Sequence, residues 1–300
     1  MIIGIEGQRL FRKKKHGMDM VALELIKNLQ DIDHENEYYI FVKPDEDDSV
    51  LKETSNFKII KLDGGSYPVW EQFALPKAAK KYGCELLHCT SNTAPLFTNI
   101  PLVTTLHDII YMENSLKDLL FSGASAYQKF GNLYRRLIVT SIVKKSKHLI
   151  TVSNFEKENI TNFFKLNDKK IQTIYNGVNE KYKTEISEEA LVDLKTNYKL
   201  PKHYLLHISN KDPRKNTKRV LLAYKDFIKA TDAKYKLVML GCNDDNLKII
   251  LAEIDALDLY DHIVLTGYVP DEDLPIIYHL AALFLFPSLR EGFGIKIIEI

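Results

Sequence analysis

The sequence predicts an α/β protein with two open parallel sheets. Three observations lead to this prediction. Short apolar segments alternate with amphipathic ones, the apolar segments are almost uninterrupted runs of Ile, Leu and Val, and the alternation pauses over a polar stretch at 179–200 before it restarts. Strands buried on both faces of a parallel sheet have this character, because helices cover both faces. A chain of 300 residues is long enough for two such domains, which we expect over residues 1–182 and 183–300.

The first expected domain alternates strands and helices throughout. The apolar segments that predict strands are residues 2–6, 37–43, 57–62, 85–90, 102–108, 148–153 and 170–178. Residues 17–32 repeat apolar side chains at helical spacing, and residues 119–145 predict a long amphipathic helix. Residues 69–82 predict a further helix, which Pro76 must kink or interrupt because proline has no amide hydrogen. Ser153 is a suitable N-cap for the helix that follows it.

The second expected domain repeats this pattern after a polar stretch with a helix that follows Ser187. The predicted strands are residues 203–209, 235–241, 262–267 and 283–287. The predicted helices are residues 216–231, 244–257 and 271–281. Two such domains that face each other leave a cleft, and ligands of open α/β sheets bind outside the carboxyl ends of the strands. The residues directly after each strand are therefore the functional candidates.

Composition excludes several classes of protein. The 41 basic residues balance the 40 acidic ones, so we expect no nucleic acid partner. No window holds about 18 consecutive apolar residues, so no membrane span is predicted. The N-terminal residues lack the long apolar core of a signal peptide.

The cysteines indicate a reducing compartment. Cys84, Cys89 and Cys242 are too few and too scattered for a disulfide framework, which fits a cytoplasmic protein. Cys84, His88 and Cys89 lie close enough in sequence to suggest metal ligands, but no second pair follows them. Buried thiols in a strand region are the favoured interpretation.

Two strand ends of the first domain carry candidate residues. The loop after the first strand reaches Gly17, where a glycine beside free helical N–H groups suits an anion, although an ordinary loop is the alternative. The segment "TTLHD" places His107 and Asp108 at the end of another strand. Histidine readily donates and accepts protons near neutral pH, and a packed structural histidine is the alternative here.

The segment "NKDPRKN" forms a basic turn in the second domain. It places Arg214 and Lys215 between a strand end and a helix N-terminus. Two cations combined with the helix dipole suit a phosphate or diphosphate. A solvated charged turn is the alternative.

The last segment, "PSLREGFGIKIIEI", combines glycines with two glutamates. Gly292 and Gly294 let the backbone approach a ligand closely, because they have no Cβ. Glu291 lies in the turn, and Glu299 is expected two turns into a helix, about 12 Å further along at ~1.5 Å per residue. Carboxylates this far apart suit two hydroxyl-bearing parts of an elongated ligand, such as a nucleotide sugar with a central diphosphate. For Glu299 alone, a surface helix glutamate is the alternative.

Together these segments resemble retaining glycosyltransferases of family 4, which have the GT-B fold of two Rossmann-like domains. "EGFGIKIIE" resembles the family signature of two glutamates separated by seven residues. Other recurring blocks of the family are similar to "RKKKHGMDMVALELIKNL", "TLHD", "VSNFEKENI", "IYNGV" and "PRKN", in the family's order. The family normally continues beyond the second glutamate, so we expect the 300 residues to be a stretch of a longer protein.

The resemblance implies a role for each candidate. It implies that His107 and Glu291 act at the transferred sugar, with His107 on the side of the 6-hydroxyl. The residues that it implies at the donor diphosphate are Gly17, Arg214, Lys215, Gly292, Phe293 and Gly294. The residues that it implies at the nucleoside are Glu299 at the ribose and Tyr268 and Val269 at the base. Asn176 and Gly177 would lie at a turn near the domain junction. No metal and no other cofactor are implied, because cations and N–H groups take the metal's place.

Two positions depart from the family pattern. Lys296 replaces a frequent proline, which leaves the choice of donor open, and Ser209 replaces an arginine of some subfamilies. Phosphate binding is therefore expected to depend more on Arg214 and Lys215.

The resemblance also implies the reaction and its partners. It implies transfer of a hexose, with retention, from GDP-mannose as the first choice or a UDP-sugar as the second. The acceptor would be a glycan or a polyprenyl-lipid-linked glycan of cell-surface polysaccharide biosynthesis, including lipopolysaccharide. The basic loop Arg12–Lys15 would meet an acidic acceptor or the inner face of the membrane, with a solvated loop as the alternative. Two rival functions remain: a nucleotide-sugar epimerase of the same fold, and a non-catalytic nucleotide-sugar-binding scaffold.

Overall fold

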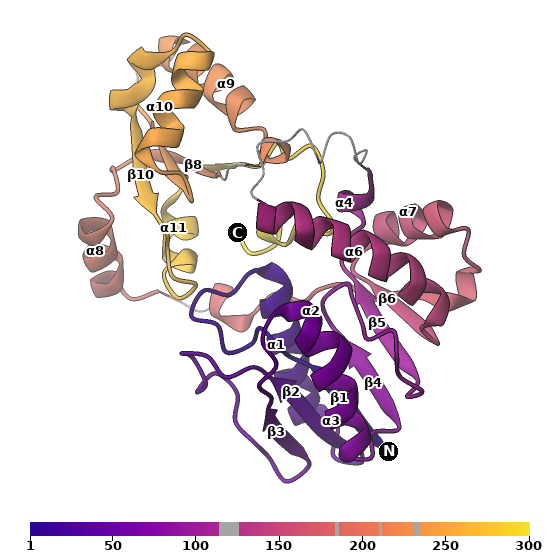
Figure 1. The fold of residues 1–300 in the computed structure, drawn as a ribbon. Coiled ribbons are helices and arrows are strands. Elements are labelled where there is room, and N and C mark those ends of the chain that lie inside the picture. The colour runs from indigo at the N-terminus through magenta and orange to yellow at the C-terminus, as the bar shows by residue number, and fades with distance from the viewer. Residues whose placement is uncertain (114–125, 184–185, 210–211, 231–233) are drawn as a thin grey trace. The chain divides into compact units, whose positions relative to one another are not determined.

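The computed structural model (Figure 1) describes residues 1–113, 126–183, 186–209, 212–230 and 234–300. This part of the chain divides into two compact units, unit 1 (Met1–Asn176) and unit 2 (Gly177–Ile300). Each unit contains its own parallel sheet, so the predicted α/β class with two sheets is confirmed. The division falls between Asn176 and Gly177, whereas the boundary was expected between residues 182 and 183.

Unit 1 contains a seven-stranded sheet in the order β3-β2-β1-β4-β5-β6-β7. Its strands are β1 (Ile2–Glu6), β2 (Glu37–Val42), β3 (Phe57–Lys61), β4 (Leu86–Cys89), β5 (Leu102–Leu106), β6 (His148–Thr151) and β7 (Ile171–Thr173). All neighbouring strands are parallel, so their carboxyl ends meet at one edge. The strand order reverses between β1 and β4, which makes this point the topological switch where open sheets bind ligands.

Helices cover both faces of this sheet. They are α1 (Gly17–Ile32), α2 (Tyr67–Val69), α3 (Leu75–Lys81), α4 (Ile110–Glu113), α6 (Ala126–Lys145) and α7 (Asn154–Phe164). Successive side chains of β2 point to opposite faces: Ile40 packs in one core with Ile26 of α1, and Phe41 packs in the other with Ile142 of α6. Ser153 caps α7 by accepting a hydrogen bond from the amide of Glu156, as predicted.

The helix expected at 69–82 is continuous but contains a π turn. Residues Trp70–Ala74 are π-helical, and the amide of Leu75 donates to the carbonyl of Trp70, five residues back. Pro76 therefore falls where the winding changes from π to α, directly after Leu75, and the helix passes it without a break. The extra residue of the π turn buries Trp70 and Glu71 side by side, both with no exposed surface.

Unit 2 contains a four-stranded parallel sheet in the order β10-β9-β8-β11. Its strands are β8 (Tyr204–Ile208), β9 (Lys236–Leu240), β10 (Ile263–Gly267) and β11 (Leu283–Leu285). Its helices are α8 (Glu188–Asn197), α9 (Thr217–Ala230), α10 (Asp244–Glu253) and α11 (Leu274–Leu280). Leu205 and Leu206 of β8 pack in separate cores on the two faces. The strand order reverses between β8 and β11, so this sheet also has a switch point.

The helix expected to carry Glu299 is not formed. Only a 3-10 turn is present, Ile295–Ile297, and a single α-type bond joins the amide of Glu299 to the carbonyl of Ile295. The predicted two-turn separation along a helix is therefore wrong.

Two further expectations concern thiols and membrane spans. Cys84, Cys89 and Cys242 are buried free thiols, as predicted. Within the described ranges, no helix is long and apolar enough to cross a bilayer. Residues 119–125 of the helix expected at 119–145 lie outside the described residues.

Candidate functional site

The segments that follow β8 and β11 are bonded to each other at the switch point of unit 2. The amide of Leu289 donates to the carbonyl of Arg214 at 2.8 Å. The side-chain amide of Asn216 donates to the carbonyl of Pro287 at 3.1 Å. Two motifs that are far apart in sequence, "PRKN" and "PSLREGFG", thus form one surface at the carboxyl edge of the sheet.

An ion pair between Lys215 and Glu291 lies at the centre of this surface. Lys215 Nζ is 2.6 Å from Glu291 Oε1, which also accepts a hydrogen bond from the hydroxyl of Ser288. Lys215 Nζ lies 5.3 Å from the centroid of the Phe286 ring, within the range of a cation–π contact. The two charged side chains are only 19% and 27% exposed, so both are held in place. An ammonium group has three N–H donors, and those not used by Glu291 suit an anionic ligand.

Arg214 is held differently from Lys215. Its Nε lies 2.9 Å and its Nη2 2.5 Å from Asp212 Oδ2. Asp212 also caps the 3-10 helix Pro213–Lys215 by accepting a hydrogen bond from the amide of Arg214. Burial opposes ionisation of Asp212, but its hydrogen bonds with Arg214 lower the pKa of this carboxyl overall. The sequence interpretation missed Asp212, which is the counter-ion of Arg214 as Glu291 is the counter-ion of Lys215.

The buried side chain of His207 in β8 contacts both β11 and the start of α9, next to this surface. His207 Nδ1 lies 2.9 Å from the carbonyl of Leu285, and because a carbonyl only accepts, Nδ1 carries the hydrogen. His207 Nε2 then accepts from the hydroxyl of Thr217 at 3.1 Å. Burial, together with the charge of Lys215, lowers the pKa of His207. Ser209, where some relatives were expected to have arginine, lies 3.0 Å from the same Thr217 hydroxyl and is buried.

Gly294 has the backbone conformation that favours glycine. Its φ of 79° and ψ of 38° are left-handed, and the 3-10 turn Ile295–Ile297 starts directly after it. A residue with a Cβ is strained in this conformation. Gly292 does not have a positive φ.

Glu299 does not share partners with Glu291. Its Oε2 accepts a hydrogen bond from Lys296 Nζ at 2.6 Å, and its side chain is only 9% exposed. Burial and then the charge of Glu299 raise the pKa of Tyr182 and of Tyr278, which places this carboxylate beside both rings. The unexpected Lys296 is therefore the counter-ion of Glu299.

The two residues predicted at the base have different surroundings. Tyr268 is 57% exposed, whereas Val269 is buried in the core that contains Ile277. The side chain of Val269 therefore belongs to the core and does not face solvent. Gly267, which precedes both, is left-handed with a φ of 69°.

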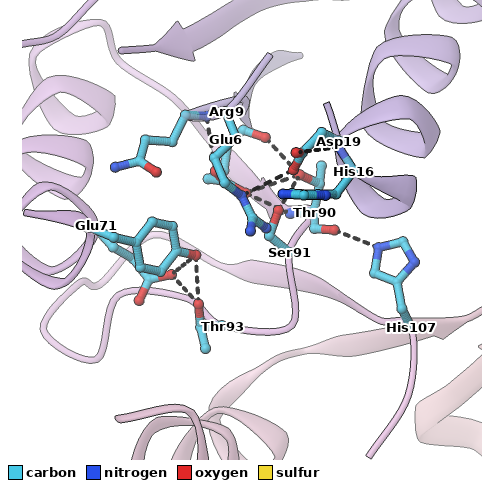
Figure 2. Close-up of polar contacts among 11 residues, drawn as sticks. Glu6, Arg9, His16, Asp19, Glu71, Thr90, Ser91, Thr93 and His107 are labelled. Atoms are coloured by element: carbon cyan, nitrogen blue, oxygen red, sulfur yellow. Dashed lines mark hydrogen bonds and ion pairs between the residues drawn. The ribbon is translucent and has the colours of Figure 1, made fainter. Parts of the chain in front are cut away.

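A buried polar cluster lies at the switch point of unit 1, at the carboxyl ends of β1 and β4 (Figure 2). Thr90 Oγ1 lies 2.9 Å from the backbone carbonyl of Glu6 and 3.0 Å from its carboxylate. Arg9 Nε lies 3.1 Å from Asp19 Oδ1, and Asp19 Oδ2 accepts from the amide of His16 at 3.0 Å. Asp19 therefore fixes the start of α1, where Gly17 is located.

Glu71 is a second buried carboxylate of unit 1. It accepts hydrogen bonds from the hydroxyls of Tyr67, Thr93 and Tyr134 and from the side-chain amide of Gln72. Burial raises the pKa of Glu71, although the three hydroxyls oppose this effect. Its partners come from α2, the loop after β4, and α6, so Glu71 joins three segments.

His107 has a defined tautomer. Its Nε2 lies 2.8 Å from the carbonyl of Thr90, so Nε2 carries the hydrogen and Nδ1 is a hydrogen-bond acceptor (Figure 2). Its backbone amide donates to the side chain of Asn92 at 2.7 Å. Burial lowers the pKa of His107, so the ring is neutral at pH 7. It is 7% exposed, and Nδ1 has no hydrogen-bond partner among the residues that the structure describes.

The predicted residues thus fall into separate groups. Gly17 and His107 lie at the carboxyl edge of unit 1. The structure brings Arg214, Lys215 and Glu291 together in unit 2, while Glu299 lies with its own counter-ion. Sequence reasoning missed the carboxylates of Glu6, Asp19 and Glu71, although a glutamate that ends an otherwise apolar strand, as Glu6 does, is a usable signal. In the described part of the chain, no group of three or more His, Cys, Asp and Glu side chains is arranged to hold a metal ion.

Both units match known family models. Residues 16–182, more than half of the chain, match the model described as Glycosyltransferase Family 4. Residues 193–300 match the model described as Glycosyl transferases group 1.

Two bacterial relatives illustrate the similarity in sequence. The chain is 29% identical over 197 residues to the O-antigen chain mannosyltransferase B of Escherichia coli, an alignment that covers 66% of the chain and 49% of that protein. It is 28% identical over 222 residues to the O-antigen chain mannosyltransferase RfbU of Salmonella typhimurium, covering 73% of the chain and 54% of the relative. The chain thus spans about half the length of these relatives.

Solved structures show the same fold at low identity. The chain aligns over its full length with 77% of HepE from Anabaena, in complex with UDP and glucose, with a TM-score of 0.67 and 16% identity. It aligns over its full length with 78% of WaaG, a glycosyltransferase involved in lipopolysaccharide biosynthesis, with a TM-score of 0.66 and 15% identity. From these matches and its two parallel-sheet units, the chain belongs to Glycosyltransferase Family 4 and has the GT-B fold.

Proposed function

We propose that the protein transfers a hexose, with retention, from a nucleoside-diphosphate sugar to a glycan or lipid-linked glycan acceptor. The observation that carries the proposal is the Lys215–Glu291 pair at the switch point of unit 2, next to the left-handed Gly294. A cation and a carboxylate at one strand end suit a ligand in which a diphosphate is joined directly to a sugar. Mannose is the first choice because the E. coli and Salmonella relatives are named mannosyltransferases. A UDP-sugar is the second, because HepE has been solved with UDP and glucose.

Each residue then has a role that follows from its chemistry. Lys215 and the amides of Phe293 and Gly294 would stabilise the diphosphate as it gains negative charge on leaving. Glu291 would accept hydrogen bonds from sugar hydroxyls, and Glu299 would do the same for the ribose. His107, neutral and with Nδ1 as an acceptor, would accept a hydrogen bond from a hydroxyl of the transferred sugar and not donate one. Gly17 would let the start of α1 approach the diphosphate.

Retention would follow from attack on the same face as the departing diphosphate. A double displacement needs a carboxylate nucleophile close to a second acid, about 5 Å apart. Glu291 is instead bonded to Lys215 and Ser288, which suits a binding role. We also propose that the reaction needs no metal, because Lys215 and backbone amides would neutralise the diphosphate.

The test begins with thermal shifts of the chain against GDP, UDP, ADP and their sugar conjugates. A ligand that binds the folded state raises the melting temperature as its concentration exceeds Kd. A selective shift with one nucleotide, lost in Lys215→Ala and kept in Lys218→Ala, supports the donor site and identifies the base. Absence of any shift contradicts the proposal.

Product analysis then separates the rival functions. A transferase consumes donor only when an acceptor is present, and NMR of the product reports the anomeric configuration. An epimerase would change the sugar without an acceptor, and a scaffold would bind nucleotide without turnover. Activity that survives EDTA agrees with a metal-independent reaction, and inversion at the anomeric carbon would overturn the retaining assignment.

A further inference from the structure

The outer side of α6 and of the segment before α3 exposes large apolar side chains. On α6, Phe130, Leu133 and Leu137 are 59%, 44% and 63% exposed. Their spacing of three and four residues places them on one face of the helix. Phe73, just before α3, is 67% exposed. Contiguous exposed apolar side chains are uncommon on a free protein surface and mark contact sites.

These apolar side chains come from segments that lie side by side. The side-chain amide of Gln72 lies 2.9 Å from the hydroxyl of Tyr134, which joins the residue before Phe73 to α6. Leu75 of α3 and Ile142 of α6 pack in the same core. Both helices therefore cover the same face of the unit 1 sheet.

The same two segments are strongly basic. Residues 72–84 contain three Lys or Arg and residues 126–147 contain six, and neither range contains Asp or Glu. Lys77, Lys80 and Lys144 are exposed and form no ion pair with any described residue. This excess of positive charge is local, since the whole chain has a formal net charge of only +1.

The basic loop Arg12–Lys15 is less available to an anionic surface than these lysines are. Lys15 Nζ lies 2.5 Å from Asp47 and its side chain is only 9% exposed. Lys13 Nζ lies 3.1 Å from Glu46. The acidic turn beside this loop thus neutralises part of its charge.

We propose that Phe73, Phe130, Leu133, Leu137, Lys77, Lys80 and Lys144 form a docking face that seats unit 1 on an anionic phospholipid surface. Amphipathic helices with aromatic and leucine side chains beside lysines bind such interfaces, because apolar groups enter the acyl boundary while cations meet the headgroups. A second copy of the chain would bring two cationic faces together. A soluble polyanion would leave the four apolar side chains without a role.

The topology orients this face with respect to the strand ends. Helices between parallel strands run from the carboxyl edge of the sheet back to its amino edge. Phe130, near the start of α6, therefore lies toward the edge that carries His107, and Lys80 and Lys144, near the ends of their helices, lie toward the opposite edge. The inference does not depend on the donor or on catalysis.

The test is flotation of the chain with vesicles of phosphatidylglycerol and phosphatidylcholine and with vesicles of phosphatidylcholine alone, at low and at high salt. We expect flotation with the anionic vesicles only, weakened by salt. At roughly a fivefold loss per lysine, the triple variant Lys77→Gln, Lys80→Gln, Lys144→Gln should bind about 100-fold more weakly. The triple variant Phe130→Gln, Leu133→Gln, Leu137→Gln should also lose flotation.

Matched variants of unit 2 serve as controls. Val192, Ile249 and Leu257 are similarly exposed, and their Gln variants should float like the unchanged chain. The same holds for Gln variants of the exposed Lys195 and Lys202. Only variants whose melting temperature equals that of the unchanged chain enter the comparison.

Several outcomes would overturn the proposal. One is the absence of flotation with either kind of vesicle, and another is equal flotation of the apolar triple variant. Binding to dextran sulfate that depends on the lysines alone would assign the face to an acidic glycan. Concentration-dependent dimerisation, lost in the apolar triple variant, would assign it to a second copy.

Discussion

Lys215 Nζ lies 2.6 Å from Glu291 Oε1, and this pair joins the loop after β8 to the loop after β11 at the point where the strand order reverses. The two residues are 76 positions apart in the chain. Each is the nearest opposite charge of the other, so a change in one alters the position and the charge balance of its partner.

Replacing Lys215 by alanine should reduce donor affinity by more than the loss of one contact. The variant removes one of the two cations of the site and leaves Glu291 partly buried without its counter-ion, and a charged hydrogen bond of this kind contributes about 1.5–3 kcal/mol. We expect at least a tenfold higher Kd for nucleoside diphosphate by calorimetry. Lys218, whose pair with Glu253 is exposed, is the matched control, and its alanine variant should bind normally. Equal loss in both variants would contradict the assignment.

Replacing Gly17 by alanine should separate stability from donor binding. Gly17 does not have a positive φ, and a Cβ built there meets no atom within 4 Å. The melting temperature should therefore be unchanged or slightly higher. If α1 approaches the diphosphate at this residue, the added methyl group should weaken donor binding several-fold in the same preparation. Unchanged affinity would remove Gly17 from the donor site.

Stability should fall as the pH is lowered below neutrality. Burial lowers the pKa of His88 to about 4, and it lowers those of His107 and His207, so the unfolded chain binds more protons than the folded one. The contribution of these neutral histidines to the free energy of unfolding is complete above the unfolded pKa of about 6.5. It is lost as the pH falls toward 4. His88 alone should cost about 2 kcal/mol at pH 5 relative to pH 8.

Urea unfolding at pH 8, 6 and 5 measures this effect. His88→Asn should flatten the pH dependence, although the variant is itself less stable at pH 8. The exposed His203 provides the control, because its Asn variant should leave the pH dependence as it is. A midpoint that does not change between pH 8 and pH 5 would show that these histidines are not held neutral.

Tyr134→Phe should destabilise unit 1, because it removes one of the hydroxyls that solvate the buried carboxylate of Glu71. Loss of a hydrogen bond to a buried charged group costs about 1.5–3 kcal/mol, which a shift of the unfolding midpoint would report. Tyr260 is the matched control, since its hydroxyl bonds to the exposed Asp244 and its Phe variant should unfold like the unchanged chain. Similar midpoints for both variants would mean that Glu71 is satisfied without Tyr134.

The sequence predicted the elements well because their signals are local. Alternation of apolar segments with helical periodicity located α1 at Gly17–Ile32, and Ser153 is the N-cap that its side chain suggested. A helix also follows Ser187, as expected. The helix expected at Glu299 was wrong, because the structure forms only the 3-10 turn Ile295–Ile297 there. The π turn before Pro76 was not predicted, since proline signals an interruption but not its form.

The sites were predicted less completely because their contacts are remote in sequence. Arg214, Lys215 and Glu291 were recognisable from cations, glycines and a carboxylate next to strand ends. The partners of Glu6 and Glu71 lie 84 and 63 positions away, at Thr90 and Tyr134. For Glu71, nothing in the local sequence distinguishes the buried carboxylate from a solvated one, and only the folded unit brings its hydroxyl donors together.

The π turn at Trp70–Ala74 gives unit 1 a tolerance to chain length at this point. Because the turn absorbs one residue beyond ordinary α-helical winding, the helix on either side of it keeps its orientation toward the sheet. Deleting one residue there is expected to remove the bulge and to disturb the side-by-side burial of Trp70 and Glu71, while Ala78 and Ala79 still face the core. Natural variants one residue shorter between β3 and β4 are therefore expected to have an uninterrupted α-helix at this point.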